Sequence, residues 1–174
     1  MINIIVVNGV GGSGKTALEN FFIDIATSNK ETCNIYSMVS RVKEIATYAG
    51  WNGGKTDKDR KFLSDLKIAL TEWADIPRKS VKEEIEKADT NGDSYIFIDA
   101  REPDDIDWLK EIFPGQVTTV LVDREINRKY GNIADDGVLN YQYDLCIKNT
   151  GTLDDLRASA ETFYEILNHS MHDN

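Results

Sequence analysis

The chain has 174 residues, 41% of them hydrophobic, which is enough for one well-buried core and too few for two ordinary domains. It carries 30 acidic and 20 basic residues, for a net charge of -10. Because nucleic-acid backbones are bound by clustered lysine and arginine, this acidic balance argues against DNA or RNA as a partner. We therefore expect a single domain, residues 1–174, with no nucleic-acid partner.

Cysteine use and hydropathy indicate the compartment. Cys33 and Cys146 are in no metal-ligand spacing, and both fall in expected strands, where we expect them to be small core residues. No apolar run reaches the length of a membrane span, and the N-terminus begins with strand residues instead of a signal peptide. The sequence therefore predicts a soluble, cytoplasmic protein with no membrane partner.

Strand-like and helix-like segments alternate along the chain. Short apolar runs predict five strands, at residues 2–7, 33–38, 95–98, 117–122 and 145–147. Apolar residues at helical spacing predict helices at residues 16–26, 39–49, 57–73, 77–91, 103–113 and 153–167. Residues 124–136 are expected to form a polar loop. This alternation predicts an α/β protein in three layers, with a mainly parallel sheet and helices on both faces.

Two helix starts have capping residues. Asp57 is expected to cap the third helix, and Thr152 and Asp155 have capping-box spacing before the last one. The third helix has the clearest amphipathic pattern. Its apolar face consists of Phe62, Leu63, Leu66, Ala69, Leu70 and Trp73.

Residues 9–16, Gly-Val-Gly-Gly-Ser-Gly-Lys-Thr, fill every fixed position of the phosphate-loop pattern G-x-x-x-x-G-K-[ST]. The segment joins a predicted strand to a predicted helix, which is the context that the chemistry requires. Glycines let backbone N–H groups close around phosphate oxygens, and the helix presents its positive end to the same anion. The predicted nucleotide-binding residues of this loop are Gly9, Gly11, Gly12, Ser13, Gly14, Lys15 and Thr16.

Lys15 and Thr16 have separate roles in this pattern. The lysine reaches the β- and γ-phosphates of a nucleoside triphosphate, and the threonine hydroxyl holds Mg²⁺. A second segment, residues 53–56, also reads Gly-Gly-Lys-Thr. We reject it as a phosphate loop because Ala49 stands at the first glycine position and no strand precedes it.

Asp99 follows the four apolar residues 95–98, which is the Walker B arrangement. We expect its carboxylate to orient Mg²⁺ through water, and the alternative is an acid that merely ends a strand. Arg101 lies two residues on, so it points to the same side of an extended segment, where it can reach a substrate.

Two segments are cationic in this acidic chain. Residues 41–61 contain six cations and three acids, and a smaller group follows the fourth strand, with Arg124, Arg128 and Lys129. Solvated surface is the alternative explanation. Phosphoryl transfer needs alignment and charge neutralisation, and arginine suits both. We therefore expect residues 39–90 to form an acceptor-binding helical segment and residues 124–136 a short lid.

Several stretches together resemble the P-loop deoxynucleoside monophosphate kinases of phage and bacterial type. They are VNGVGGSGKTALENF, GWNGGKTDKDRKFLSDLK, IDAREPDDIDWL and YDLCIKNTGTLDDL, in order over most of the chain. The resemblance implies a P-loop NTPase fold with a five-stranded parallel sheet of order 2-3-1-4-5, ATP with Mg²⁺ as donor, and a nucleoside monophosphate as acceptor. This chain is shorter than the larger phage enzymes, and its lid is brief.

Roles carried over from the resemblance follow the matching positions. Lys15 and Thr16 would bind the donor phosphates and the metal, and Asp99 and Arg101 would face the acceptor. The remaining implied positions are Arg41 and Arg60 on the monophosphate side, Arg124 and Arg128 in the lid, and Asn149 and Gly151 near the donor base. The implied catalytic residues are Lys15, Asp99, Arg101, Arg124 and Arg128.

The sequence therefore predicts an ATP-dependent kinase that converts a (deoxy)nucleoside monophosphate to its diphosphate. Two alternatives stay open. One is a kinase of another small phosphorylated metabolite, because phosphomevalonate kinases also resemble the middle segment. The other is a nucleotide-binding regulatory module that is not a kinase. Residues 147–150 do not match the guanine-reading pattern Asn-Lys-x-Asp, which disfavours a GTPase. The oligomeric state is not determined, and a homodimer is left open.

Overall fold

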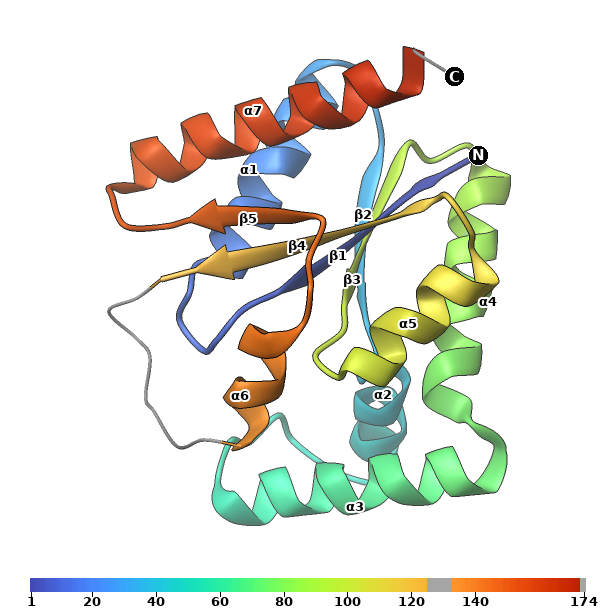
Figure 1. The fold of residues 1–174 in the computed structure, drawn as a ribbon. Helices are drawn as coiled ribbons and strands as arrows, with labels where there is room; N and C mark the ends of the chain where they lie inside the picture. Colours follow the sequence, from blue (N-terminus) through green and yellow to red (C-terminus); the bar gives the residue numbers. More distant parts are fainter. Residues whose placement is uncertain (125–132, 173–174) are drawn as a thin grey trace.

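The computed structural model describes residues 1–124 and 133–172. Five parallel strands form one sheet in the order β2-β3-β1-β4-β5, which confirms the predicted strand order (Figure 1). The strands are β1 (Asn3–Asn8), β2 (Cys33–Ser37), β3 (Tyr95–Asp99), β4 (Val117–Asp123) and β5 (Leu145–Lys148).

Helices cover both faces of the sheet, as predicted for an α/β fold (Figure 1). They are α1 (Lys15–Ser28), α2 (Ser40–Tyr48), α3 (Asp57–Ala74), α4 (Ile76–Asn91), α5 (Pro103–Ile112), α6 (Ile133–Asn140) and α7 (Leu153–His172). None of the helices within the described ranges is both long and apolar enough to cross a membrane.

Alternate residues of the central strand divide the core into two parts. Ile5 and Val7 of β1 point to the face covered by α1 and α7, where Phe22 packs edge-on against Tyr95 and Phe97. Ile4 and Val6 point to the opposite face, which is covered by α4 and α5. All these strand positions are at most 2% exposed, so the central strands β1 and β3 are buried on both faces, as in parallel sheets generally.

The strand register determines where polar side chains gather. Asp99, the last residue of β3, is paired with Val7 of β1 and with Ser37 of β2. The carboxyl ends of these three parallel strands therefore meet at one edge of the sheet, next to the loop that leaves β1. Ligand sites of open α/β sheets form at this edge.

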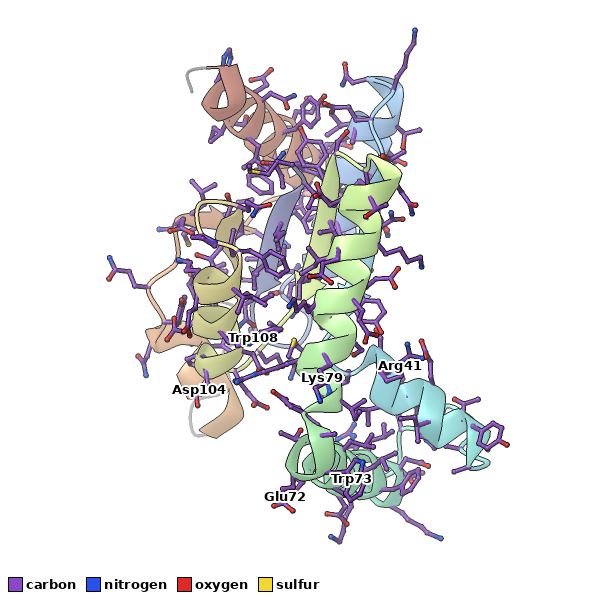
Figure 2. All side chains as sticks on the ribbon, turned by 90° about the vertical axis from the view of Figure 1, so that its right-hand side faces the viewer. Arg41, Glu72, Trp73, Lys79, Asp104 and Trp108 are labelled. Atoms are coloured by element: carbon purple, nitrogen blue, oxygen red, sulfur yellow. The ribbon has the colours of Figure 1, made fainter. Side chains whose placement is uncertain are left out.

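Helix α3 is less buried than its amphipathic pattern predicts. It packs mainly on α2 and α4, on the outside of the molecule (Figure 1). None of its residues is buried, and Trp73, predicted on its apolar face, is 84% exposed (Figure 2). Its N-cap is Thr56 in a capping box with Asp59, so the predicted cap, Asp57, is instead the first helical residue.

Two further expectations from the sequence are wrong. Helix α6 begins at residue 133, inside the segment expected to be a loop. This stretch contains Gly137, a poor helix former, and tertiary contact overrides the weak propensity: Val138 is 2% exposed, and its carbonyl accepts a hydrogen bond from Tyr143. Cys146 is exposed and so is not a core residue, whereas Cys33 is half-buried and packs against the core.

Candidate functional site

The loop between β1 and α1 contains every residue of the predicted phosphate-binding pattern. Gly9 has φ 149°, and a Cβ atom there would lie 2.5 Å from the carbonyl oxygen of Val122. Gly14 has φ 103°, and a Cβ atom there would overlap the side-chain amide of Asn149. Positive φ and close approach both require glycine at these two positions. Gly11, Gly12 and Ser13 lie between them in the same loop.

Neighbouring strand ends hold this loop in place. The Asn8 side chain accepts a hydrogen bond from the N–H of Gly9 (2.9 Å) and donates one to the carbonyl of Arg101 (3.2 Å). The Asn149 amide, 8% exposed, donates to the carbonyl of Ser13 (2.8 Å). The loop is thereby attached to the segments that follow β3 and β5.

The groups that would contact a phosphate lie at the start of α1. The Lys15 ammonium donates to the carbonyls of Gly9 (2.5 Å) and Val10 (3.3 Å), so this side chain folds back over the loop. Helix α1 has no acidic residue in its first turn and no side-chain cap. Its positive N-terminal end is therefore not neutralised locally, which is the arrangement that binds anions in phosphate loops.

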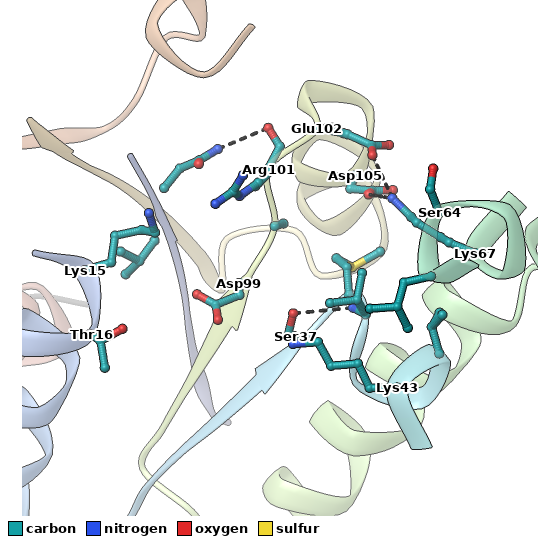
Figure 3. A pocket seen from close by; sticks show the side chains of 17 residues that line it. Lys15, Thr16, Ser37, Lys43, Ser64, Lys67, Asp99, Arg101, Glu102 and Asp105 are labelled. Carbon is teal, nitrogen blue, oxygen red and sulfur yellow. Dashed lines mark hydrogen bonds and ion pairs between the residues drawn. The ribbon is translucent and has the colours of Figure 1, made fainter. Parts of the chain in front are cut away.

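A cavity of about 480 Å³ adjoins the loop at the carboxyl edge of the sheet (Figure 3). Its charged and hydroxyl lining consists of Lys15, Thr16, Ser37, Lys43, Ser64, Lys67, Asp99, Arg101, Glu102 and Asp105. Its apolar lining consists of Val7, Met38, Val39, Val42, Leu63 and Ala100. In Figure 3, Lys15 and Thr16 lie on one side of Asp99, and Lys67 and Lys43 lie on the other, with Arg101 between.

The residues predicted to bind the metal fit a divalent cation. Asp99 and the Thr16 hydroxyl both line the cavity. Glu19, on the next turn of α1, is 3% exposed, and its Oε1 has no hydrogen-bond partner among the described residues. Burial of the Glu19 carboxyl, together with the charge of Asp99 and a hydrogen bond to it, raises the pKa of Glu19 to about 7. Oxygen ligands of this kind suit Mg²⁺, which binds one or two carboxylates together with nucleotide phosphates.

The cavity includes only one of the three arginines predicted on the acceptor side. Arg101 lines it, whereas Arg41 and Arg60 are not among the described residues that do so. Arg41 is instead paired with Glu44 at 2.6 Å on the surface of α2. The cations that α2 and α3 present to the cavity are Lys43 and Lys67. The sequence located the cationic helices, but it did not determine which side of each helix faces the sheet.

Lys67 belongs to a chain of alternating charges at the far end of the cavity. Its ammonium lies 2.7 Å from Glu102 and 3.9 Å from Asp105 (Figure 3). Asp105 also accepts a hydrogen bond from the Arg78 guanidinium at 2.9 Å, and this guanidinium stacks over Trp108. Burial raises the pKa of Asp105, although Arg78 and Lys67 oppose the shift. Sequence reasoning missed this cluster because its members come from three different helices.

The remaining predicted residues lie as follows. Arg124 directly follows β4 and is half-buried, while Arg128 is outside the described residues. Asn149 contacts the phosphate loop itself. Gly151 precedes the predicted capping box, in which Thr152 and Asp155 exchange hydrogen bonds.

Comparisons with known proteins identify the fold. No protein-family model matches the chain, and no curated protein matches it in sequence. Among solved structures, it is similar to the APS kinase of Mycobacterium tuberculosis in complex with AMPPNP and APS, with a TM-score of 0.55 and 11% identity over 96% of this chain and 98% of that one.

Two further solved structures are similar to this chain over almost its whole length. A gluconokinase from Sinorhizobium meliloti 1021 has a TM-score of 0.52 and 15% identity, over 98% of this chain and 95% of that one. A sugar kinase from Janibacter sp. HTCC2649 has a TM-score of 0.52 and 20% identity, over 95% of this chain and 96% of that one. At these identities the similarity establishes only the fold that this chain shares with the three structures.

Proposed function

We propose that this chain, which has the P-loop kinase fold, is an ATP-dependent kinase that phosphorylates a (deoxy)nucleoside monophosphate to its diphosphate. The observation that carries the proposal is the cavity of about 480 Å³ that continues from the phosphate loop. Lys15 and Thr16 belong to both the loop and the cavity wall, so a phosphate held by the loop is exposed to whatever occupies the cavity. A module that only binds nucleotide needs no such second compartment.

Different residues of the site have different roles in phosphoryl transfer. The backbone N–H groups of the loop and the Lys15 ammonium bind the donor phosphates. A phosphate oxygen of the acceptor attacks the γ-phosphorus as the bond to the β-phosphate oxygen breaks, which yields ADP and the phosphorylated acceptor. Arg101, between the two compartments, neutralises charge on the transferred group. Thr16 and Asp99 would hold Mg²⁺, which when bound neutralises charge on the β- and γ-oxygens.

The lining of the cavity supports a nucleotide as acceptor. Met38, Val42 and Leu63 offer an apolar surface for a planar base, and the cations Arg101 and Lys43 offer partners for its phosphate. The other acceptor class, a different small phosphorylated metabolite, is supported by one fold neighbour, an APS kinase in complex with AMPPNP and APS. Both classes use the same donor half of the site.

The test is a coupled ADP-release assay with ATP and Mg²⁺ across a panel of nucleoside and deoxynucleoside monophosphates. We expect at least one monophosphate to raise turnover well above the rate with water alone. A panel that never exceeds this background would contradict the nucleotide acceptor. The same assay is run with a second panel of small phosphorylated metabolites, and stimulation only by a member of that panel would assign the protein to the alternative kinase class.

Lys15→Ala tests the donor half. We expect kcat/KM to fall by a factor on the order of 100 or more, because the charge that stabilises the transferring phosphate is lost. Unfolding free energy should change by less than about 1 kcal/mol, since the side chain is half-buried and stands at the first residue of α1, outside the core. The matched control is Lys55→Ala, in the exposed second Gly-Gly-Lys-Thr segment, which should leave kinetics unchanged. An active Lys15→Ala enzyme would show that the assigned role is wrong.

A further inference from the structure

Glu19 is a buried carboxyl group to which the proposed transfer assigns no role. It is 3% exposed, and its Oε1 has no hydrogen-bond partner within the described part of the chain. A buried polar atom without a partner costs free energy, so it calls for a functional explanation. The hydrogen bond to Asp99 still leaves this oxygen without a partner, and glutamate is rarely this buried unless it is paired or bound to a metal.

Two charged groups act on Glu19. Asp99, at the end of β3, is a carboxyl group that is hydrogen-bonded to it, and Lys15 is the cation that acts on it. The Lys15 ammonium donates to the carbonyls of Gly9 and Val10. Two carboxyl groups in contact repel each other when both are ionised, and a cation between them removes the repulsion.

The position of Glu19 on α1 places its carboxyl group on the same side of the helix as the Thr16 hydroxyl. It follows Thr16 by three residues, and helix residues at this spacing lie on the same face. The Thr16 hydroxyl and the Glu19 carboxyl therefore both face Asp99. Mg²⁺ takes oxygen ligands and uses one or two carboxylates beside the phosphates of its nucleotide. The described residues contain no group of three or more histidine, cysteine, aspartate or glutamate side chains that could hold a metal without a nucleotide.

We propose that Glu19 is a further residue of the divalent-cation site, in which its carboxylate, with Asp99 and Thr16, holds the cation that accompanies the bound nucleotide. The inference rests on the proposed function only in requiring that a nucleotide and its cation bind. It does not depend on which acceptor is phosphorylated. The phosphate-loop pattern assigns the threonine at position 16, and it assigns nothing to position 19.

The experiment measures Mn²⁺ binding by electron paramagnetic resonance in the presence of ADP, where no phosphoryl transfer occurs. Glu19→Gln should weaken Mn²⁺ binding at least tenfold, because a neutral amide replaces an anionic ligand. ADP binding in EDTA should stay within twofold of that of the wild-type protein. Asp99→Asn should weaken Mn²⁺ binding in the same way. Asp105→Asn is the matched control, since Asp105 is also buried, at 6% exposed, but lies at the far end of the cavity.

The outcomes separate this inference from the proposed function. Equal Mn²⁺ affinity of Glu19→Gln and wild type would overturn the role of Glu19, while the kinase proposal stands. A wild-type protein that binds neither ADP nor ATP would instead overturn the proposed function. If Glu19→Gln does not fold, Glu19→Asp decides, because it keeps the charge and withdraws it by one methylene. Weaker Mn²⁺ binding by that variant supports the proposal, and unchanged binding overturns it.

Discussion

Individual side chains at the carboxyl edge of the sheet experience opposing electrostatic effects. Lys15 and the start of α1 make the loop positive, which favours phosphate. Glu19 and Asp99 bring two carboxyl groups together beside it. The repulsion between these carboxyl groups destabilises the protein without ligand, and a bound cation would remove it. The free protein is therefore less stable than it would be without this carboxyl pair, and the same pair gives the site its affinity for a cation.

Glu19→Gln should alter how stability depends on pH in the metal-free protein. The folded protein keeps the Glu19 proton until pH about 7, whereas the group normally loses it near 4.5. Between these values the folded state binds more protons, so wild-type stability falls as pH rises and stays lower above pH 7. We expect Glu19→Gln to be more stable than wild type at pH 8, by as much as about 3 kcal/mol, and equally stable near pH 4.5.

Urea denaturation in EDTA at both pH values checks this expectation. Glu161→Gln, an exposed acid on α7, is the control and should shift neither value. The same stability difference at pH 4.5 and pH 8 would mean that the effect comes from packing and not from ionisation.

At the scale of elements, the phosphate loop is held by contacts that link strand ends far apart in sequence. Asn149 follows β5, and its backbone N–H donates to the carbonyl of Asp123 at the end of β4 (2.8 Å). Its side chain then reaches the Ser13 carbonyl in the loop. The edge strand β5 therefore helps to fix the loop geometry, although it is two strands away from β1.

Asn149→Ala should weaken both stability and nucleotide binding. The substitution leaves the buried Ser13 carbonyl without its side-chain donor, which costs about 1–3 kcal/mol. The loosened loop should raise the KM for ATP more than the KM for the acceptor. Urea denaturation and an ATP titration measure the two effects. Asn34→Ala is the control, because Asn34 donates to Asp93 at an exposed site, and an equal loss there would contradict a specific role for Asn149.

Across the whole molecule, the described helices differ in how they are anchored. Helix α7 places Leu156, Ala160 and Phe163 in the core, whereas α3 has no buried residue. α3 is joined to the α5 side of the cavity by the ion pairs of Lys67 with Glu102 and Asp105. This helix also forms one wall of the cavity, so its position determines the room available to an acceptor.

Hydrogen exchange should show this difference in anchoring. Amides of α3 should exchange faster than those of β1 and α7, because few buried contacts oppose local opening. Lys67→Met should speed exchange in α3 further, because loss of the ion pairs lowers the free energy of local opening by roughly 1 kcal/mol. Lys61→Met is the matched control, since Lys61 pairs only with Asp65 of the same helix among the ion pairs found. Equal exchange in the two variants would show that the Lys67 cluster does not anchor α3.

Features that depend on neighbours along the chain could be predicted from the amino-acid sequence. The phosphate loop is a contiguous pattern with a strand before it and a helix after it, so residues 9–16 could be identified directly. Apolar runs located all five strands, and the strand order 2-3-1-4-5 implied by the family resemblance is confirmed. The capping box of Thr152 and Asp155 is likewise a local spacing.

Contacts between side chains of separate elements could not be predicted in this way, because they depend on tertiary packing. The rotation of α2 and α3 about their axes brings Lys43 and Lys67 to the cavity, while Arg41 pairs with Glu44. The contact between Glu19 and Asp99 depends on how α1 packs on the sheet. Local spacing specifies that a helix forms and which residues share a face, but the packing of one element on another determines what that face contacts.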